Sequence, residues 1–364
     1  MIAPPGKPDQ GPAERLLLVQ MLRAMAASMV VVHHAQHDAE AVAAHLGLAF
    51  TRGDLLPWLS GVDIFFVISG FVMVHASANL FGRVGARRVF LTRRLIRIVP
   101  LYWIATTIYL AVALIAPRVL NSDAPSLWQI IASYLFIPFM RADGFVQPVY
   151  SLGWTLNFEM LFYFVFAAAI ALPRRWAVAA ASAGLALLVA GNRYLGPWPL
   201  PLGFWGDTIV LEFALGMGLA LLRAQGLRLP GLLRLALIAA GFFLLHLDLS
   251  AADGGVVPQF LGYGIPAAFI VAAAVLGRET GRPPVFERFL VALGDASYAL
   301  YLLHPFAIRA LGQLEARTPL GALLGPWGFV ALAYLAAVAL ALAAHRWGER
   351  PLLDRLRRLG SPAR

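Results

Sequence analysis

An arginine and a histidine share one face of the first apolar segment of the chain. Arg23 and His34 are eleven residues apart, which at about 100° per residue returns to nearly the same helix face, about 16 Å further along the axis. An ionisable side chain inside a membrane helix is costly, so it usually has a functional partner or lines a water-filled cavity. Alternatively, Arg23 reaches the near headgroups and His34 ends the span at the interface. The spacing alone leaves both interpretations open.

Three further ionisable residues are predicted to lie at a similar depth to His34, each in a different apolar segment: Asp63, Glu159 and His304. Histidine and carboxylate together can supply a general base and its orienting partner, which is the minimum needed to activate a hydroxyl for acyl transfer. A metal site of these residue types is chemically compatible. No two of the candidates have the short helical spacing common in metal sites, so no metal is predicted. Each of the three could instead be a polar contact between helices.

Six arginines lie within 83–97, directly before the sequence PLYW at 100–103. Most such clusters anchor the topology or contact anionic lipids. Arg94 and Arg97, however, are three residues apart on one helix face, and they point toward the mouth of the bundle if Pro100 opens the helix there. Two guanidinium groups in such a fork suit the phosphates of a nucleotide-like donor.

The composition is typical of a multi-pass helical membrane protein. Of the 364 residues, 60% are hydrophobic and only 13% are charged, which excludes an ordinary soluble domain. The absence of cysteine excludes disulfides, thiolate metal sites and a cysteine nucleophile. The net charge of +10 is assigned to cytoplasmic loops and not to nucleic-acid binding, because the chain is so apolar. The fold class is therefore all-α, a polytopic membrane helix bundle.

The distribution of arginines selects a topology. If the apolar but short stretch within 127–150 is re-entrant or interfacial, most of the 29 basic residues fall on one side of the membrane. If it crosses, the C-terminal arginine cluster is exported, against the positive-inside bias. Both termini are therefore expected to be cytoplasmic. Ten segments are predicted to span the bilayer: 16–35, 57–76, 98–116, 152–172, 176–194, 204–222, 232–249, 259–277, 289–310 and 326–345.

The chain is expected to form one membrane domain at 15–347, between a disordered cytoplasmic tail at 1–14 and a basic cytoplasmic tail at 348–364. The first 14 residues are rich in proline and glycine and have no apolar face to bury. No signal peptide is predicted, because Arg23 interrupts the first apolar region.

Several sequence blocks, in this order and spacing, resemble acyltransferase family 3. Each block is weak alone, but together they cover almost the entire chain. They are the arginine and histidine of the first segment, GVDIFFVISGF at 61–71, Arg94-x-x-Arg97 with PLYW, WTLNFE at 154–159 with Phe162-Tyr163, GDASYALYLLHP at 294–305 and ERP at 349–351.

The resemblance implies a membrane enzyme that moves a short acyl group, most often acetyl, from cytoplasmic acyl-CoA to a hydroxyl. The usual acceptors are surface or exported polysaccharides or their lipid-linked precursors, and some members modify small molecules such as macrolides. Arg23, His34, Arg94 and Arg97 fall on the family's functional positions, whereas Asn157 stands where serine is more common. The chain looks like the short form, which has no appended extracytoplasmic domain and occurs among exopolysaccharide-modifying members.

The sequence therefore predicts an O-acyltransferase of the bacterial inner membrane, with membrane lipids around it. Arg94 and Arg97 would hold the phosphates of acetyl-CoA or another short acyl-CoA, and Arg23 would stabilise charge along the path. His34 would act as general base or carry the acyl group covalently, oriented by Glu159 or Asp63. The rival interpretation is a transporter or flippase-like protein that uses the same buried charges without covalent chemistry. The sequence shows no internal symmetry of the kind common in transporters. The oligomeric state stays open.

Overall fold

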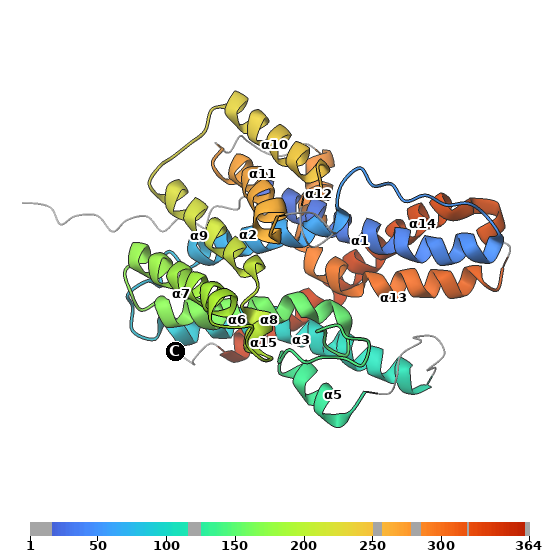
Figure 1. Cartoon of the computed structure of the whole chain (residues 1–364), viewed down its shortest axis with the longest axis horizontal. Helices are drawn as coiled ribbons and strands as arrows, with labels where there is room; N and C mark the ends of the chain where they lie inside the picture. The colour runs from blue at the N-terminus through green and yellow to red at the C-terminus, as the bar shows by residue number, and fades with distance from the viewer. Residues whose placement is uncertain (1–16, 116–124, 250–256, 278–284, 319, 361–364) are drawn as a thin grey trace, which may run out of the picture.

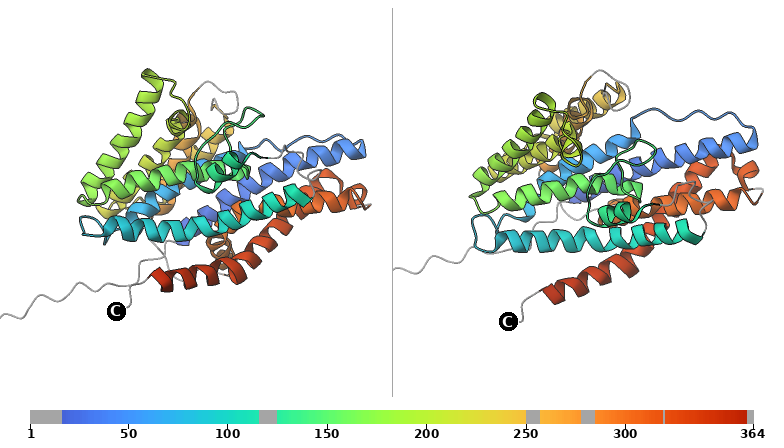
Figure 2. Two further views of the ribbon diagram at one scale, coloured as in Figure 1. Left: turned by 90° about the horizontal axis from the view of Figure 1, so that it is seen from below. Right: turned by 60° about the horizontal axis from the view of Figure 1, so that its bottom comes forward.

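The computed structural model describes residues 17–115, 125–249, 257–277, 285–318 and 320–360. Within these ranges the chain is helical apart from its loops and one isolated β-bridge between Met140 and Val146. The predicted all-α fold class is therefore confirmed for this part of the chain. The longest helices run roughly along the long axis of the molecule (Figure 1, Figure 2). The predicted disordered tail at 1–14 lies outside the described residues.

The order of the helices follows the order of the predicted segments. The α-helices are α1 (Leu17–Leu46), α2 (Gly61–Ala76), α3 (Ala86–Ile115), α5 (Leu127–Tyr134), α6 (Trp154–Ala169), α7 (Arg174–Tyr194), α8 (Leu202–Trp205), α9 (Leu211–Ala224), α10 (Gly231–His246), α11 (Ile265–Val275), α12 (Val285–Asp295), α13 (Ser297–Glu315), α14 (Leu320–Ala344) and α15 (Arg350–Gly360). Short helical turns precede some of them: η1 (Trp58–Ser60), η2 (Ser151–Gly153), η3 (Thr208–Val210), η5 (Phe260–Gly264) and η6 (His345–Glu349).

Within the described residues, six helical stretches are long and apolar enough to cross a membrane. A seventh is added if α12 and α13, which are bent by 78° relative to each other, form one span. The six are Leu17–Leu46, Trp58–Ala76, Ala86–Ile115, Ser151–Ala169, Arg174–Tyr194 and Leu323–Arg358.

The other three predicted spans contain helices shorter than the roughly 20 residues of a typical crossing. Helix α9 has 14 residues, α10 has 16, and η5 continues into α11 over Phe260–Val275. All ten predicted segments thus contain a helix, while length and composition qualify six or seven of them as spans. Between α3 and α6, the stretch 127–150 forms only the eight-residue helix α5 and a loop, which is too short to cross the bilayer.

The third span begins earlier than predicted. Helix α3 starts at Ala86, so the arginines from Arg87 to Arg97 belong to the span helix itself. Arginine is a good helix former, which explains the extension. Pro100 lies inside α3 and the helix continues through it, so the predicted opening at Pro100 is not present. Proline inside a membrane helix is tolerated where local contacts satisfy the released backbone groups.

The ninth predicted segment, 289–310, is divided between α12 and α13. At the end of α12, Gly294 packs against α1 so closely that an added Cβ would lie 2.0 Å from the carbonyl oxygen of Gln20. Such an approach is open only to glycine. It brings Ser297, the first residue of α13, to Arg23 on α1. The bend between α12 and α13 therefore places the Ser297 hydroxyl beside Arg23.

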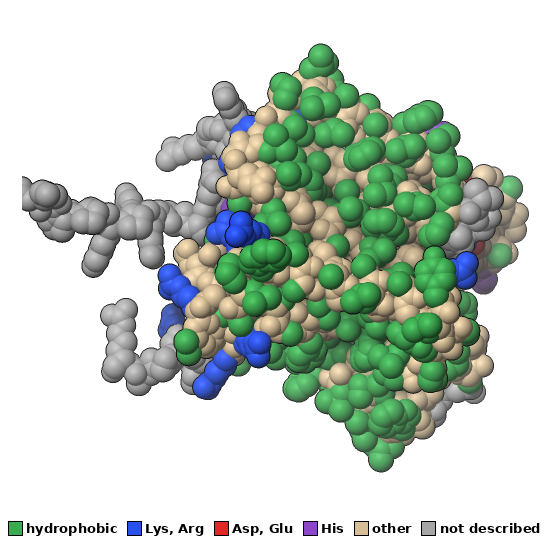
Figure 3. Space-filling model, turned by 60° about the vertical axis from the view of Figure 1, so that its left-hand side comes forward, with side chains coloured by type: hydrophobic (Ala, Val, Ile, Leu, Met, Phe, Trp, Pro, Cys, Tyr) green, Lys and Arg blue, Asp and Glu red, His purple; other side chains and the backbone are tan. Residues whose placement is uncertain are grey.

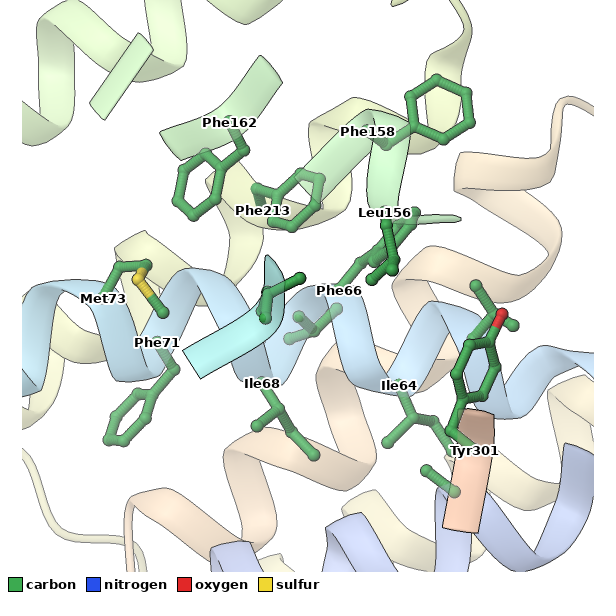
Figure 4. Packing of buried hydrophobic residues seen from close by; sticks show 14 of the residues in the cluster. Ile64, Phe66, Ile68, Phe71, Met73, Leu156, Phe158, Phe162, Phe213 and Tyr301 are labelled. Carbon is green, nitrogen blue, oxygen red and sulfur yellow. The ribbon is translucent and has the colours of Figure 1, made fainter. Parts of the chain in front are cut away.

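Aromatic side chains from α2, α6 and α9 occupy the centre of the bundle (Figure 4). The ring of Phe213 stacks on those of Phe66 and Phe162, with centroids 4.6 Å and 4.3 Å apart. Each such pair contributes about 0.5–1.5 kcal/mol beyond the burial of its area. Next to them, an added Cβ on Gly70 or Gly216 would lie 2.1 Å or 1.9 Å from a backbone oxygen of the facing helix. Small residues thus allow close helix packing, which matters in lipid because apolar burial does not drive helices together there.

Helix ends that carry arginines meet at one end of the bundle. The Arg174 side chain at the start of α7 donates to the carbonyl oxygen of Ala78 after α2, 3.5 Å away. Arg97 of α3 contacts Glu349 of η6, and Arg23 near the start of α1 lines the same cavity as Arg97. Figure 3 shows most of the Lys and Arg side chains of one largely hydrophobic face toward one edge, with a smaller charged group at the opposite edge. Segments predicted to lie on one side of the membrane are therefore neighbours in the structure.

Candidate active site

A cavity of about 130 Å³ lies between α1, α2, α3, α6 and α13. Its wall combines apolar side chains, of which Phe66, Ile68 and Leu156 are labelled in Figure 4, with a set of polar ones. We call it the arginine cavity. Its polar lining consists of Arg23, Ser69, Arg94, Arg97, Thr155, Glu159, Tyr163, Ser297, Tyr298 and Tyr301. Four of the residues singled out in the sequence, the three arginines and Glu159, thus share one cavity.

Arg23 points into the bundle and not toward the headgroups. Its Nε donates a hydrogen bond to Oγ of Ser297, 3.1 Å away on α13. Its charge also interacts with Arg97, Glu349 and Asp295. The interpretation in which Arg23 only reaches for the membrane surface does not describe this geometry.

Arg94 and Arg97 are brought together as the fork that their spacing predicted. The Nε of Arg94 is buried and, among the described residues, has no hydrogen-bond partner. One Nη of Arg97 lies 3.5 Å from Oε1 of Glu349. A buried N–H group of a cation that makes no hydrogen bond carries a desolvation cost. The Arg94 guanidinium is therefore suited to receive an anionic group that enters the cavity.

Glu159 lies among these cations. Its Oε1 accepts hydrogen bonds from Oγ of Ser69 at 2.5 Å and from the hydroxyl of Tyr163 at 2.7 Å. Its charge interacts with Arg94 and Arg23. Three guanidinium groups against one carboxylate in the lining leave the cavity with an excess of positive charge, which favours a negatively charged ligand.

His34 and His304 form a histidine pair between α1 and α13. Their ring centroids are 5.0 Å apart. In each ring Nδ1 faces a carbonyl oxygen one turn back in its own helix, Val30 at 2.9 Å and Leu300 at 3.1 Å. These contacts favour the neutral tautomer with the proton on Nδ1 and a lone pair on Nε2. The Nε2 of His304 is buried without a hydrogen-bond partner in the described part of the chain. This nitrogen lies beside, and not in, the lining of the arginine cavity.

The structure places Glu159 and Asp63, the two carboxylates predicted to orient His34, against other partners. The Nδ1 of His34 is bound to its own helix, and Glu159 lies in the arginine cavity. Asp63 accepts a hydrogen bond of 2.9 Å from Nε2 of Gln259 and interacts with Glu212. A similar depth in the membrane does not by itself bring side chains together, because helices differ in direction and in the face that they turn toward their neighbours.

Tyr301 connects the arginine cavity to the histidine pair. Its side chain lines the cavity, and its ring centroid lies 6.3 Å from that of His304. Its hydroxyl lies 2.9 Å from Oγ1 of Thr155. Neither Tyr301 nor Ser297 was predicted as a site residue, although both lie in the block at 294–305 that carries the family resemblance. Ser297, Tyr301 and His304 are spaced by four and three residues, which places them on one face of a helix. This spacing could have indicated that they belong to one site.

Asn157, at the position where serine is more common in the family, is fully buried. Within the described ranges, no group of three or more His, Cys, Asp or Glu side chains is arranged to hold a metal ion.

Comparison with known proteins identifies the family. The sequence model of the acyltransferase family 3 domain matches residues 18–346. The exopolysaccharide production protein ExoZ of Rhizobium meliloti (strain 1021) is 34% identical over 299 residues, which are 81% of this chain and 90% of that protein. The acyltransferase MdmB of Streptomyces mycarofaciens is 29% identical over 284 residues, 68% of this chain and 67% of that protein. No solved structure matches the chain.

The family assignment agrees with the helical architecture and with the apolar helices long enough to span a membrane in the described residues. It also decides between enzyme and transporter. The chain belongs to acyltransferase family 3 and is a membrane acyltransferase.

Proposed function

We propose that the protein transfers a short acyl group, acetyl in the first instance, from cytoplasmic acyl-CoA to a hydroxyl of an exported polysaccharide or its lipid-linked precursor. The observation that carries the donor half of this proposal is the arginine cavity, in which the buried Nε of Arg94 makes no hydrogen bond within the described chain. The acceptor half is supported by the similarity to an exopolysaccharide production protein over 90% of that protein's length.

On the donor side, Arg94 and Arg97 bind phosphate groups of the coenzyme at the arginine-rich end of the bundle. Guanidinium groups match phosphate oxygens in charge and in planar geometry. The long, flexible arm of the coenzyme then extends along α1 toward the histidine pair, about 16 Å from Arg23 by the helix rise. Arg23 stabilises negative charge on the thioester or along this arm.

On the acceptor side, Nε2 of His34 takes the proton of the acceptor hydroxyl. The hydroxyl oxygen forms the new ester bond to the acyl carbon, the carbon–sulfur bond breaks, and the imidazolium returns the proton to the leaving thiolate. The Val30 carbonyl oxygen holds the required tautomer, and His304 stands beside the reacting ring. In the covalent alternative, Nε2 of His34 carries the acyl group before the hydroxyl attacks. Mass spectrometry of protein quenched during turnover separates the two, because only the relay gives acylated His34.

We further propose ten membrane crossings in the bacterial inner membrane with both termini cytoplasmic. The support is the spatial grouping of the arginine-bearing helix ends around α3, α7 and η6. Because the chain has no cysteine, single cysteines introduced near Arg175 and Arg358 can be labelled without background. Both positions should be protected from a membrane-impermeant reagent in intact cells. Labelling of either from outside contradicts the topology.

The experiment that tests the function compares surface polysaccharide from cells with and without the gene by mass analysis. The expected result is the loss of an acyl mass from the polysaccharide, restored by the wild-type gene but not by His34→Ala. An unchanged polysaccharide, with acyl transfer by the purified protein to a small molecule instead, contradicts the proposed acceptor class.

A further inference from the structure

A second pocket adjoins the histidine pair through His33. It has a volume of about 230 Å³ and is enclosed by α1, the loop at 51–57, η1 and the end of α10. The ring centroid of His33, which lines it, lies 5.2 Å from that of His34. We call it the loop pocket. The polar and aromatic residues of its lining that matter here are His33, Gln36, Arg52, Asp54, Trp58 and Asp248.

Hydrogen bonds to α1 and α10 hold the loop in place. The side-chain oxygen of Gln36 accepts from the backbone N–H of Gly53 at 2.5 Å. The indole N–H of Trp58 donates to the carbonyl oxygen of Gly53 at 2.6 Å. Nδ1 of His246 lies 2.9 Å from the carbonyl oxygen of Leu55. The loop runs back along α1 to reach η1 (Figure 1). The pocket is therefore preformed, as binding sites usually are.

The charges in the loop pocket are the reverse of those in the arginine cavity. The single arginine, Arg52, is occupied by Glu40, whose two oxygens each lie 2.5 Å from its guanidinium nitrogens. The hydrogen bonds from Arg52 to Glu40 raise the pKa of Arg52, so it stays charged and paired. Asp54, whose charge also interacts with that of Arg52, and Asp248 add two acidic side chains to the wall. Asp248 accepts a hydrogen bond from the hydroxyl of Tyr263.

This lining matches a ligand that donates hydrogen bonds and carries no negative charge. Carboxylates accept strong hydrogen bonds from hydroxyl groups, and they repel a negatively charged group that enters the same pocket. The N–H of Trp58 is already used by the loop, so its ring offers an apolar surface. Hydroxyl donors next to an apolar ring face are the chemistry of an uncharged sugar.

We infer that the loop pocket binds an uncharged sugar unit of the acceptor and presents a neighbouring hydroxyl to His34, while sugars that bear carboxylate groups are disfavoured. This inference rests on the proposed function, because it assumes a glycan acceptor. It adds where the acceptor binds and which class of sugar the site selects.

The test is direct binding of two oligosaccharides of equal length to the purified full-length protein by calorimetry, one built of glucose only and the other containing glucuronic acid. Wild-type protein should bind the neutral oligosaccharide at least about tenfold more tightly, the size of effect expected when a charged hydrogen-bond acceptor faces a like charge. Asp54→Asn should weaken the neutral ligand and reduce this discrimination. Trp58→Phe should retain more affinity than Trp58→Ala, because the phenyl ring keeps an apolar face.

Asp143→Asn is the matched control. Asp143 is another loop carboxylate, paired with Arg141 and absent from the lining of both pockets, so this variant should bind both ligands like wild type. Equal binding of the two ligands by wild type, unchanged binding in Asp54→Asn and Trp58→Ala, or no binding of either ligand overturns the inference. If the neutral ligand binds as described but no acyl group is ever transferred to a glycan, the proposed function fails while the sugar site stands.

Discussion

The arginine cavity and the loop pocket differ in charge although both adjoin the same histidine pair. The cavity presents three guanidinium groups against one carboxylate and reaches the pair through Tyr301. The loop pocket presents the carboxylates Asp54 and Asp248 and one arginine, Arg52, which is held by Glu40, and it reaches the pair through His33. This asymmetry suits a group transfer between an anionic donor and an uncharged acceptor, because the guanidinium groups of the cavity attract the donor while the carboxylates of the loop pocket repel it. Donor binding and acceptor binding should therefore be separable by mutation.

His34 serves both regions, so its loss should have the largest effect. Positioned proton removal typically contributes about 10²–10⁴ in rate, and we expect His34→Ala to lower acyl transfer by this factor. His33→Ala should retain most of the turnover rate and raise the KM for the acceptor, because His33 lines the loop pocket only. Steady-state kinetics on both variants checks this. An equal loss of turnover in the two would indicate general damage to this part of α1.

Changes in the arginine cavity should affect the donor alone. Hydrogen bonds to charged groups contribute about 1.5–3 kcal/mol, so Arg94→Ala or Arg97→Ala should raise the KM for acyl-CoA by about 10- to 100-fold. Lysine should rescue only in part, because it lacks the planar fork. The KM for the acceptor should not change.

Arg93→Ala is the control for this prediction. Arg93 is adjacent in sequence but exposed and outside the cavity lining, so its replacement should leave the KM for acyl-CoA unchanged. A loss of donor affinity equal to that of Arg94→Ala would assign the effect to the general positive charge of α3.

Gly294→Ala should push α12 away from α1. This change should displace Ser297 from Arg23 in the arginine cavity. The added Cβ meets the carbonyl oxygen of Gln20 at 2.0 Å, and overpacking of this kind typically costs about 1–3 kcal/mol. We expect a lower midpoint of thermal unfolding in detergent and a weakened contact between Ser297 and Arg23. Gly312→Ala on α13, where an added Cβ has open space, should leave the midpoint unchanged.

Asp63→Asn should have the smallest effect on chemistry, because Asp63 lies in neither region's lining. Its contact with Gln259 links α2 to the start of η5, so the expected change is a modest loss of thermal stability with turnover per folded molecule retained. Activity normalised to the folded fraction measures this. A loss of turnover comparable to that of His34→Ala would place Asp63 in the mechanism after all.

The existence of the helices was predictable, but their lengths and bends were not. Apolar runs mark all ten segments because the bilayer selects for them. The start of α3 at Ala86 was missed because arginines were assigned to a loop, although they favour helix as well. The bend before Ser297 depends on the contact between Gly294 and α1, and a contact between distant segments leaves no local pattern in the sequence.

The candidate site was predicted in part. The spacing of Arg94 and Arg97 correctly placed both on one face, and both line the cavity. The contact between His34 and His304, whose ring centroids lie 5.0 Å apart, was not predicted. The partner of each carboxylate was not predictable, because depth along a helix says nothing about which neighbour a side chain faces. Tyr301 was overlooked because the sequence does not show which of the hydroxyl residues of α13 faces the cavity.

The most direct test of the two-region account is equilibrium binding of radiolabelled acyl-CoA to purified His34→Ala and Arg97→Ala, with acyl transfer measured in the same preparations. We expect His34→Ala to bind the donor with wild-type affinity and to transfer almost no acyl group. We expect Arg97→Ala to bind the donor at least about tenfold more weakly than wild type. Near-normal transfer by His34→Ala, or an equal loss of donor affinity in both variants, would contradict the separation of the donor site from the histidine pair.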